Sequence, residues 1–238
     1  MDHKLPLVIR TAVCADHPYA ELIAQEMASS ARARGTGIAQ RSVDYIRLKM
    51  SEGKAVIALT YEGVWVGFCY IEAWGHEKFV ANSGLIVSPD FRGIGVAKAI
   101  KHKIFQLSLE KYPEAKIFGL TTGLAVMKIN SELGYEPVTY SELTDDEQFW
   151  TGCKSCVNYD ILLSKNKKNC ICTAMLYNPA EKERQQSKAT GPNNPNTKRK
   201  RRFKGNFKLF ERWIRFKKHV LLKRKDAKKH NRKEMISS

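Results

Sequence analysis

The stretch VSPDFRGIGVAKAI (residues 87–100) carries the clearest chemical signal in the sequence. An apolar segment ends at Val87, and an arginine and two glycines then lead into residues with helical apolar spacing. Glycines let the backbone approach a ligand closely, and N–H groups at the start of a helix attract anions. The sequence therefore predicts an anion-binding turn, although a plain strand-to-helix turn would also use glycines. Its residues are Arg92, Gly93, Ile94, Gly95, Val96 and Ala97.

Four cysteines form a second candidate site, a zinc set made of Cys153, Cys156, Cys170 and Cys172. Zinc takes four soft ligands in a tetrahedron, and the spacing within each pair suits it. The intervening residues, however, read as a strand at 155–163, a turn, and a returning strand at 170–177. Such a hairpin separates the two pairs by about seven residues of strand at roughly 3.3 Å each. Zinc binding would need an irregular fold here, and reduced buried thiols are the alternative.

The elements that position these residues alternate between β-branched runs and helical apolar spacing. We expect strands at 7–13, in two halves of a hairpin within 54–74, at 82–87 and at 116–122, with the last strands in 135–143 and 155–163. Helices are expected at 17–34, 42–53, 96–112 and 124–134. This order predicts an α/β fold, with a mixed central sheet and helices on both faces.

Charge divides the chain into a nearly neutral part and a basic tail. From Thr190 to Ser238 there are 18 Lys and Arg against 3 Asp and Glu, so this stretch holds 15 of the 17 net positive charges. We expect a globular domain over 1–178, a polar linker over 179–202 and a basic amphipathic helix over 203–238. Such a helix can contact an acidic partner, nucleic acid, an anionic membrane surface or another protein.

The sequence contains no apolar run near the roughly 20 residues that span a bilayer, so no transmembrane segment is expected. Its first residues, MDHKLPLVIR, lack the apolar core of a signal peptide. We therefore expect a cytoplasmic protein with reduced thiols.

The turn at residues 92–97 resembles the Arg/Gln-x-x-Gly-x-Gly/Ala motif of the GNAT superfamily of N-acetyltransferases, with Arg92, Gly95 and Ala97 at the motif positions. The preceding VSPDF and the order of elements from 7 to about 163 are also similar to that family. The resemblance implies a GNAT fold and acetyl-CoA or another acyl-CoA as co-substrate. The pyrophosphate would bind at 92–97 and the pantetheine arm between the strands at 82–87 and 116–122. A backbone N–H within Leu85, Ile86 and Val87 would polarise the thioester.

Acyl transfer to an amine also needs groups that accept and return protons. Many family members place a tyrosine acid four residues before a Gly-aromatic pair, but that position here is Asn130, ahead of Gly134 and Tyr135. The candidate catalytic residues are therefore Glu72, Asn82 and Tyr135, with His76 nearby in sequence. Glu72 can equally be a surface carboxylate.

Several segments together resemble the acetyltransferase domain of bacterial N-acetylglutamate synthases: GIAQRS (37–42), EKFVANSGLIVSPDFR (77–92), LTT (120–122), LGYEPV (133–138) and NYD (158–160). This likeness implies transfer of an acetyl or succinyl group to the α-amino group of glutamate, the entry to arginine biosynthesis. Arg41 would then pair with a substrate carboxylate. In that subfamily a carboxylate often occupies the position of Ala81, beside Asn82. The alternatives are transfer to another small amine or a protein, or a nucleic-acid- or ribosome-associated protein with a GNAT domain.

Overall fold

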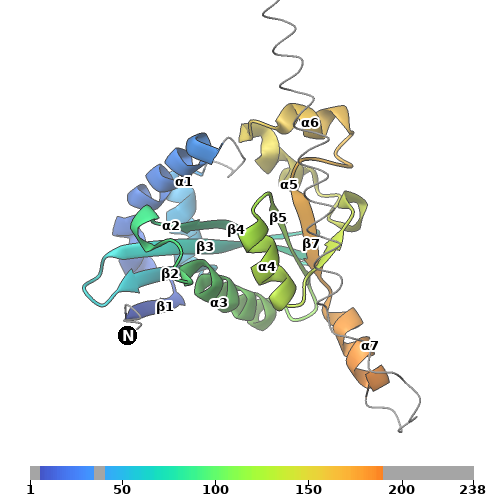
Figure 1. Cartoon of the computed structure of the whole chain (residues 1–238), viewed down its shortest axis with the longest axis horizontal. Helices are drawn as coiled ribbons and strands as arrows, with labels where there is room; N and C mark the ends of the chain where they lie inside the picture. The colour runs from blue at the N-terminus through green and yellow to red at the C-terminus, as the bar shows by residue number, and fades with distance from the viewer. Residues whose placement is uncertain (1–5, 35–40, 190–238) are drawn as a thin grey trace, which may run out of the picture. The chain divides into compact units, whose positions relative to one another are not determined.

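The computed structural model of the chain describes residues 6–34 and 41–189 (Figure 1). The described residues up to Lys188 belong to one compact unit. The basic helix expected at 203–238 lies outside the described residues, and so does the expected linker from residue 190 onward. A helix, α7 (Pro179–Ala189), occupies the first eleven residues of that expected linker.

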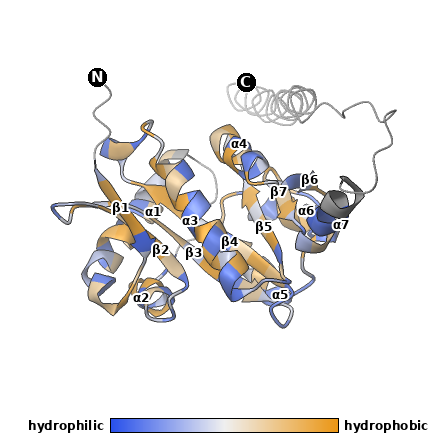
Figure 2. Ribbon diagram, turned by 90° about the horizontal axis from the view of Figure 1, so that it is seen from below, coloured by the Kyte–Doolittle hydropathy of each residue, from blue (hydrophilic) through white to orange (hydrophobic). Residues whose placement is uncertain are grey.

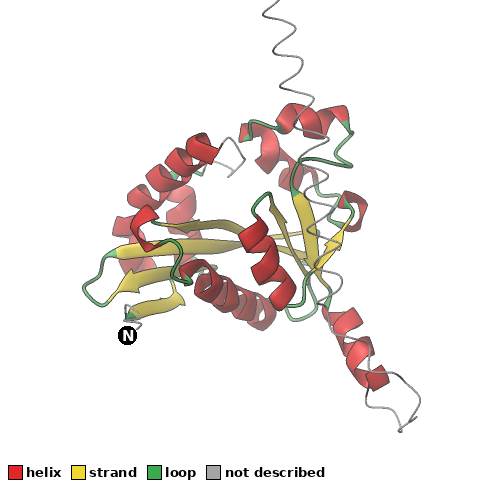
Figure 3. Ribbon diagram, in the orientation of Figure 1, coloured by secondary structure: helices red, strands yellow, loops and turns green. Residues whose placement is uncertain are grey.

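The strands of the described residues form one mixed sheet of seven strands in the order β1-β2-β3-β4-β5-β7-β6, as expected for the fold class (Figure 3). All neighbours pair antiparallel except β4 and β5, which are parallel. The strands are β1 (Leu7–Thr11), β2 (Ala55–Thr60), β3 (Trp65–Trp74), β4 (Phe79–Val87), β5 (Lys116–Thr121), β6 (Glu136–Val138) and β7 (Thr173–Tyr177).

Helices cover both faces of this sheet, which confirms the expectation from the sequence. The longer ones are α1 (Ala20–Arg34), α2 (Val43–Ser51), α3 (Val96–Lys111) and α4 (Leu124–Glu132). Side chains of α1 and α2 join one apolar core with Phe68 of β3. Ile100 of α3 lies over the neighbouring Gly67, and successive strand residues face opposite sides, so α3 covers the other face. Within the described part, no helix is long and apolar enough to cross a membrane.

The sheet opens between β4 and β5, its two central parallel strands. They pair only over Phe79–Ala81 and Lys116–Phe118, although β4 runs on to Val87 and β5 to Thr121. Figure 2 shows β1–β4 with α1–α3 on one side of this opening and β5–β7 with α4–α6 on the other. The separation leaves the carboxyl halves of both strands without a strand neighbour on their facing edges.

The segment between β6 and β7 corrects the sequence prediction. Residues 155–163, expected as a strand, instead contain the helix α6 (Tyr159–Ser164), and β6 ends at Val138 before a 3₁₀ turn, η3 (Tyr140–Glu142). An apolar run of this length fits a strand or a buried helix equally well by pattern. Packing decides here, because Tyr159 and Leu162 lie three residues apart and both contact one apolar cluster. The predicted returning strand is confirmed as β7.

We call residues 139–172, between β6 and β7, the β6–β7 insertion. It also holds α5 (Glu147–Thr151) and the 3₁₀ turn η4 (Gly152–Ser155). Tyr140, Trp150 and Leu162 of the insertion pack with Phe118 of β5 in a second apolar cluster. This cluster fastens the insertion onto the sheet beside the opening between β4 and β5.

Candidate active site

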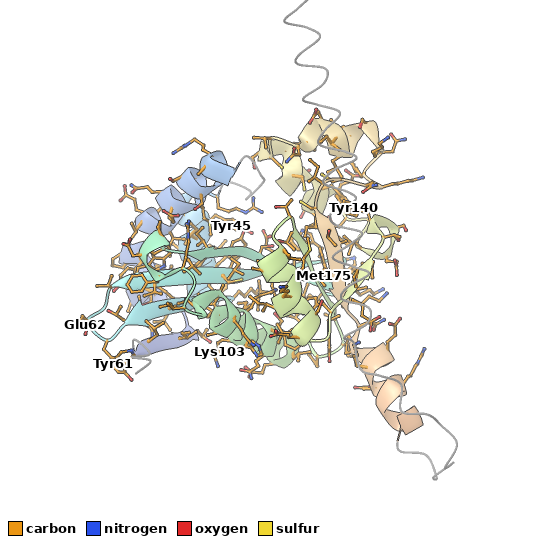
Figure 4. All side chains as sticks on the ribbon, in the orientation of Figure 1. Tyr45, Tyr61, Glu62, Lys103, Tyr140 and Met175 are labelled. Atoms are coloured by element: carbon orange, nitrogen blue, oxygen red, sulfur yellow. The ribbon has the colours of Figure 1, made fainter. Side chains whose placement is uncertain are left out.

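A cavity of about 470 Å³ lies where β4 and β5 separate. Both strands line it, with Ala81 to Leu85 on one side and Phe118 to Thr121 on the other. The residues before and in α2 and the β6–β7 insertion complete its wall. Figure 4 labels Tyr45 on the α2 side and Tyr140 on the insertion side. The expected binding region between the two strands is therefore a real cavity.

Arg41 and Glu72, separate candidates in the sequence, meet on the wall of this cavity. A terminal guanidinium nitrogen of Arg41 lies 3.4 Å from Glu72 Oε1. Arg41 Nε donates a hydrogen bond to the Tyr70 hydroxyl at 2.9 Å, and the Tyr45 hydroxyl donates a short one to Glu72 Oε1. Glu72 is only 8% exposed, so it is not the surface carboxylate that the sequence left open.

Local structure explains how α2 brings Arg41 and Tyr45 together. The Ser42 side chain caps the helix by accepting a hydrogen bond from the Tyr45 N–H at 3.2 Å. Arg41 therefore stands one residue before the helix, and Tyr45 lies on its first turn. Sequence reasoning missed Tyr45 and Tyr70 as site residues. The four-residue step from Arg41 to Tyr45 was the available signal.

Electrostatics keep the guanidinium and the two phenols of this cluster protonated. Burial, followed by the nearby charge of Glu72, raises the pKa of both Tyr45 and Tyr70, so both phenols stay protonated. Burial lowers the pKa of Arg41, but Tyr70, Glu72 and Tyr45 outweigh it and the net shift is upward. The cluster thus presents one fixed cation next to a carboxylate.

A second polar cluster surrounds Asn82, another candidate from the sequence. Asn82 Oδ1 accepts hydrogen bonds from Lys101 Nζ at 3.1 Å and from the Tyr135 hydroxyl at 3.0 Å. Its Nδ2 donates to Ser108 Oγ at 2.8 Å. Asn82 and Lys101 line the cavity, whereas Tyr135 lies behind them and is fully buried.

Lys101 is the residue of this cluster that sequence reasoning missed. It is 2% exposed, and burial lowers the pKa of its ammonium group to about 8. At that pKa the amine can exchange a proton near neutral pH. Lys101, Phe105 and Ser108 follow one another at helical steps on the buried side of α3, which was the available signal.

The two clusters reach the cavity from opposite faces of the sheet. Glu72 pairs with Ala81 in the β3–β4 ladder, and Ile71 pairs with Asn82. Paired residues project on the same side and neighbours on opposite sides, so Glu72 and Asn82 point to different faces. A ligand that passes through the opening between β4 and β5 could contact both.

The predicted anion-binding turn has open space above its backbone. Gly93 and Gly95 have φ angles of 85° and 92°, and a Cβ atom added to either would meet nothing within 4 Å. Gly95 is the N-cap of α3, whose first N–H groups have no partner inside the helix. The glycine turn therefore leads directly into α3, and its binding of an anion stays a prediction.

Arg92 has a different set of contacts from the rest of the turn. Its Nε donates to the Val87 carbonyl at 3.0 Å, and a terminal nitrogen donates to Glu26 at 2.8 Å and to Ser30 at 3.0 Å. The side chain thus fastens the turn to α1.

Strand β4 has a bulge at the expected thioester position. The register with β3 shifts so that Gly84 and Leu85 together face Cys69. A bulge leaves one residue out of the regular ladder, which frees a backbone N–H for other contacts. Leu85 lines the cavity, while the side chains of Ile86 and Val87 are buried.

Asn130, at the position where many family members have a tyrosine, is 1% exposed and lines the same cavity. Its Nδ2 lies 3.8 Å from Met175 Sδ, and its Oδ1 has no hydrogen-bond partner among the described residues. A buried amide oxygen without a partner is unfavourable, so this atom is a ready acceptor for a bound ligand.

The four cysteines gather on the insertion side of the cavity, contrary to the hairpin expected from the sequence. All four line it, because α6 and a turn replace the strand that would have separated them. The pKa of the Cys172 thiol is raised, first by a hydrogen bond with Cys170 and then by burial and the other thiols. The structure contains no disulfide at these cysteines. Among the residues that it describes, no three His, Cys, Asp or Glu side chains are already arranged to hold a metal ion.

Comparisons with known proteins agree with this architecture. The sequence model of the acetyltransferase (GNAT) family matches residues 25–125. No curated protein sequence matches the chain. The N-acetylglutamate synthase of Neisseria gonorrhoeae, solved with coenzyme A and N-acetyl-glutamate, superposes with a TM-score of 0.52 at 16% identity. That match covers 72% of this chain and 35% of the synthase, so this chain spans about a third of the synthase's length.

Two further solved structures are matched over nearly their whole length. The protein Rv2747 of Mycobacterium tuberculosis, in complex with CoA, has a TM-score of 0.51 at 19% identity over 72% of this chain and 98% of its own. A GNAT-family acetyltransferase of Staphylococcus aureus has a TM-score of 0.52 at 12% identity over 73% and 99%. At sequence identities this low, the structural matches establish the fold alone. The family model over residues 25–125 and these solved structures agree on the architecture: the described residues have an α/β GNAT fold.

Proposed function

We propose that the chain transfers an acyl group from acetyl-CoA or succinyl-CoA to the α-amino group of glutamate, as an N-acylglutamate synthase of arginine biosynthesis does. The observation that carries this proposal is the Arg41–Glu72 pair, with opposite charges 3.4 Å apart on the cavity wall. A free amino acid carries a carboxylate and an ammonium group, and this pair complements both. A simple amine without a carboxylate would make no use of Arg41.

The acyl donor would occupy the opening between β4 and β5. Its pyrophosphate would bind the backbone N–H groups of Gly93–Ala97, where open space and the start of α3 favour an anion. The thioester oxygen would lie at the Gly84–Leu85 bulge, where a backbone N–H can stabilise developing negative charge. The free Oδ1 of Asn130 would accept a hydrogen bond from the donor.

In the proposed reaction the amine nitrogen attacks the thioester carbonyl carbon, an amide bond forms and the C–S bond breaks. The ammonium group loses protons toward Glu72 and solvent, and the departing CoA thiolate gains one. Lys101, with its pKa of about 8, is our candidate for returning that proton, with Asn82 and Tyr135 positioning it. Transfer would be direct, without an acyl-enzyme. Of the cysteines that line the cavity, Cys153 has its pKa raised to about 11 by burial and by neighbouring thiols, which leaves it a poor nucleophile.

The test is an assay of CoA thiol release with acetyl-CoA and succinyl-CoA, each against glutamate, glutamine, other amino acids and common polyamines. The proposal expects release that depends on glutamate, and the faster donor identifies the acyl group. Mass spectrometry of the product should show acylation of the α-amino group. Release with polyamines but with no amino acid would overturn glutamate as the acceptor and leave the family unaffected.

One observation favours a second partner: 15 of the 17 net positive charges lie beyond residue 189. We propose that this basic segment binds an acidic macromolecule, with nucleic acid as the first candidate. Affinity for RNA and DNA should be measured for the full chain and for a chain ending at Ala189, at several salt concentrations. Binding that needs the segment and weakens steeply with salt would support nucleic acid. Equal binding by both chains would contradict it.

A further inference from the structure

The β6–β7 insertion forms the side of the cavity that an acceptor amino acid would meet. Gln148, Gly152, Cys153 and Tyr159 line it there. A Cβ atom placed on Gly152 would lie 3.4 Å from a terminal nitrogen of Arg41, so the two are in near contact. The position of the insertion therefore sets the space beside the Arg41 guanidinium.

Little regular structure holds the insertion in place. Its helices α5 and α6 have five and six residues, and helices this short are marginal without outside support. Between residues 139 and 172 no strand is present to add ladder hydrogen bonds. Its apolar cluster anchors Tyr140, Trp150 and Leu162, and Cys153 of η4 and Cys170 before β7 pack against the edge of that cluster.

The four cysteines sit at the two places where a crosslink would act. Cys153 and Cys156 lie in and after η4, closed by a hydrogen bond from the Cys156 N–H to the Cys153 carbonyl at 3.0 Å. Cys170 and Cys172 lie just before β7, and the Tyr140 hydroxyl fixes the Cys172 carbonyl at 3.0 Å. The two pairs come together near Asn158, whose N–H donates to Cys156 Sγ at 3.4 Å and whose carbonyl lies 3.9 Å from Cys170 Sγ.

We propose that Cys153, Cys156, Cys170 and Cys172 bind one Zn²⁺ ion that clamps the β6–β7 insertion. Four sulfur ligands in two short-spaced pairs are the donor set of a closed structural zinc site. Cys170, Cys156 and Cys153 all act electrostatically on the Cys172 thiol, so the four side chains share one region, but no three of the described ligand-type side chains are already arranged around one centre. Zinc binding would therefore require the cysteine side chains to rearrange. Binding replaces four thiol protons with Zn²⁺. The resulting net charge of −2 lies beside Arg41 and Lys154.

Zinc in this position would act on the acceptor side of the cavity and not on the turn that is expected to hold pyrophosphate. The metal would hold Cys153 and its neighbour Gly152 in place against Arg41. Loss of the metal should therefore weaken acceptor binding and spare CoA binding. This consequence rests on the proposed function, whereas zinc binding itself does not.

The test uses the full-length protein purified under reducing conditions without added metal. Elemental analysis should find about one zinc per chain. A chromogenic chelator should detect this zinc only after a thiol-blocking reagent has reacted with the cysteines. The double substitution Cys153→Ser/Cys172→Ser should lower the zinc content at least tenfold. Cys14→Ser, at an exposed cysteine outside the set, is the matched control and should keep it.

Cobalt substitution of the unaltered chain avoids dependence on a variant that fails to fold. Four thiolate ligands give Co²⁺ an intense absorption band from sulfur-to-metal charge transfer and visible bands typical of a tetrahedron. The proposal would be overturned if the wild-type protein held no zinc, showed none of these bands after Co²⁺ addition and had all six thiols free. A disulfide among the four, found by mass spectrometry of the freshly isolated chain, would overturn it too. If the protein held one zinc and released CoA without needing glutamate, the proposed function would be contradicted and the zinc site would stand.

Discussion

Arg41 and Glu72 are already partners in the described cavity, so an amino acid that binds there must exchange contacts with both. Tyr45 and Tyr70 hold the two side chains in place while this exchange occurs, because each donates to or accepts from one of them. In the proposed function, the guanidinium, the carboxylate and the two phenols would form a preorganised acceptor site. In the proposed reaction, Glu72 would accept a proton on the acceptor side, and Lys101, on the other face of the sheet, would return one to the leaving thiolate.

Substitution of Arg41 by Met should raise the KM for glutamate by about 10- to 100-fold, because a charge-assisted hydrogen bond contributes roughly 1.5–3 kcal/mol. The effect on kcat should be smaller. Arg47→Met on the exposed side of α2, where Arg47 pairs with Asp44 at 3.3 Å, is the matched control. Steady-state kinetics with both variants measure this. Equal KM values for the two variants would exclude Arg41 from acceptor binding.

Lys101 should leave a signature in the pH dependence of stability. Its folded-state pKa of about 8 lies below its ordinary value of 10.5, so the folded protein releases this proton first. The free energy of unfolding should therefore rise as pH increases through 8, by about 1 kcal/mol between pH 8 and 9. Below pH 8 the buried charge destabilises the fold to its full extent.

Lys101→Met should abolish this rise, because the substituted side chain cannot titrate. Lys98→Met, at an exposed position of the same helix paired with Glu132, should retain it. Urea denaturation at pH 7, 8 and 9 compares the three proteins. The assignment of the pH dependence to Lys101 fails if the free energy of unfolding rises equally with pH in the wild type and in Lys101→Met.

At the scale of elements, two glycine positions in and next to the predicted donor site differ in what surrounds them. Gly84, in the β4 bulge with a φ of 64°, has no room, since an added Cβ would lie 2.2 Å from Tyr70 Cε1. Gly95, at the start of α3, has open space. Packing against Tyr70 therefore explains why Gly84 has no side chain. At Gly95 the positive φ is one reason for a glycine, and a ligand that needs the open space would be a second.

Gly95→Ala should weaken CoA binding by at least tenfold while lowering stability by only about 1 kcal/mol, the usual effect of a side chain at positive φ. Gly53→Ala is the control, because Gly53 also has a positive φ of 61° and lies after α2. Calorimetric titration with CoA and thermal unfolding separate the two effects. If both variants bind CoA like wild type, the turn is not the pyrophosphate site.

At the scale of the described unit, the parallel β4–β5 pairing over three residues is the only strand ladder that joins β1–β4 to β5–β7. A donor bound in the opening would add contacts to both halves. The two halves should therefore be stabilised together when CoA binds.

CoA at 100 times its Kd should stabilise the protein by about 2.7 kcal/mol. Hydrogen exchange should slow in β4 beyond Ala81, in β5 beyond Phe118 and at the start of α3, because these segments surround the opening. Hydrogen exchange in β1 and β2 should slow only as far as the overall gain in stability requires. If CoA slowed hydrogen exchange equally in all segments, with no extra effect in β4, β5 and α3, CoA would bind elsewhere.

Features that depend on near neighbours in the chain were predictable from the amino-acid sequence. The Ser42 cap, the hairpin of β2 and β3, and the glycine turn into α3 were predictable because hydrogen bonds and backbone angles over a few residues produce them. The fold class followed from the order of these elements, and the GNAT resemblance from residues 92–97.

Tertiary structure alone decided the features that join distant segments. It placed the helix α6 within the segment expected as a strand at 155–163, since Leu162 gains a buried place beside Trp150 that pattern cannot reveal. It also paired Arg41 with Glu72 and buried Lys101 against Asn82, across separations of 31 and 19 residues. Contacts at such separations depend on how whole elements pack, and single-sequence patterns report only the element to which each residue belongs.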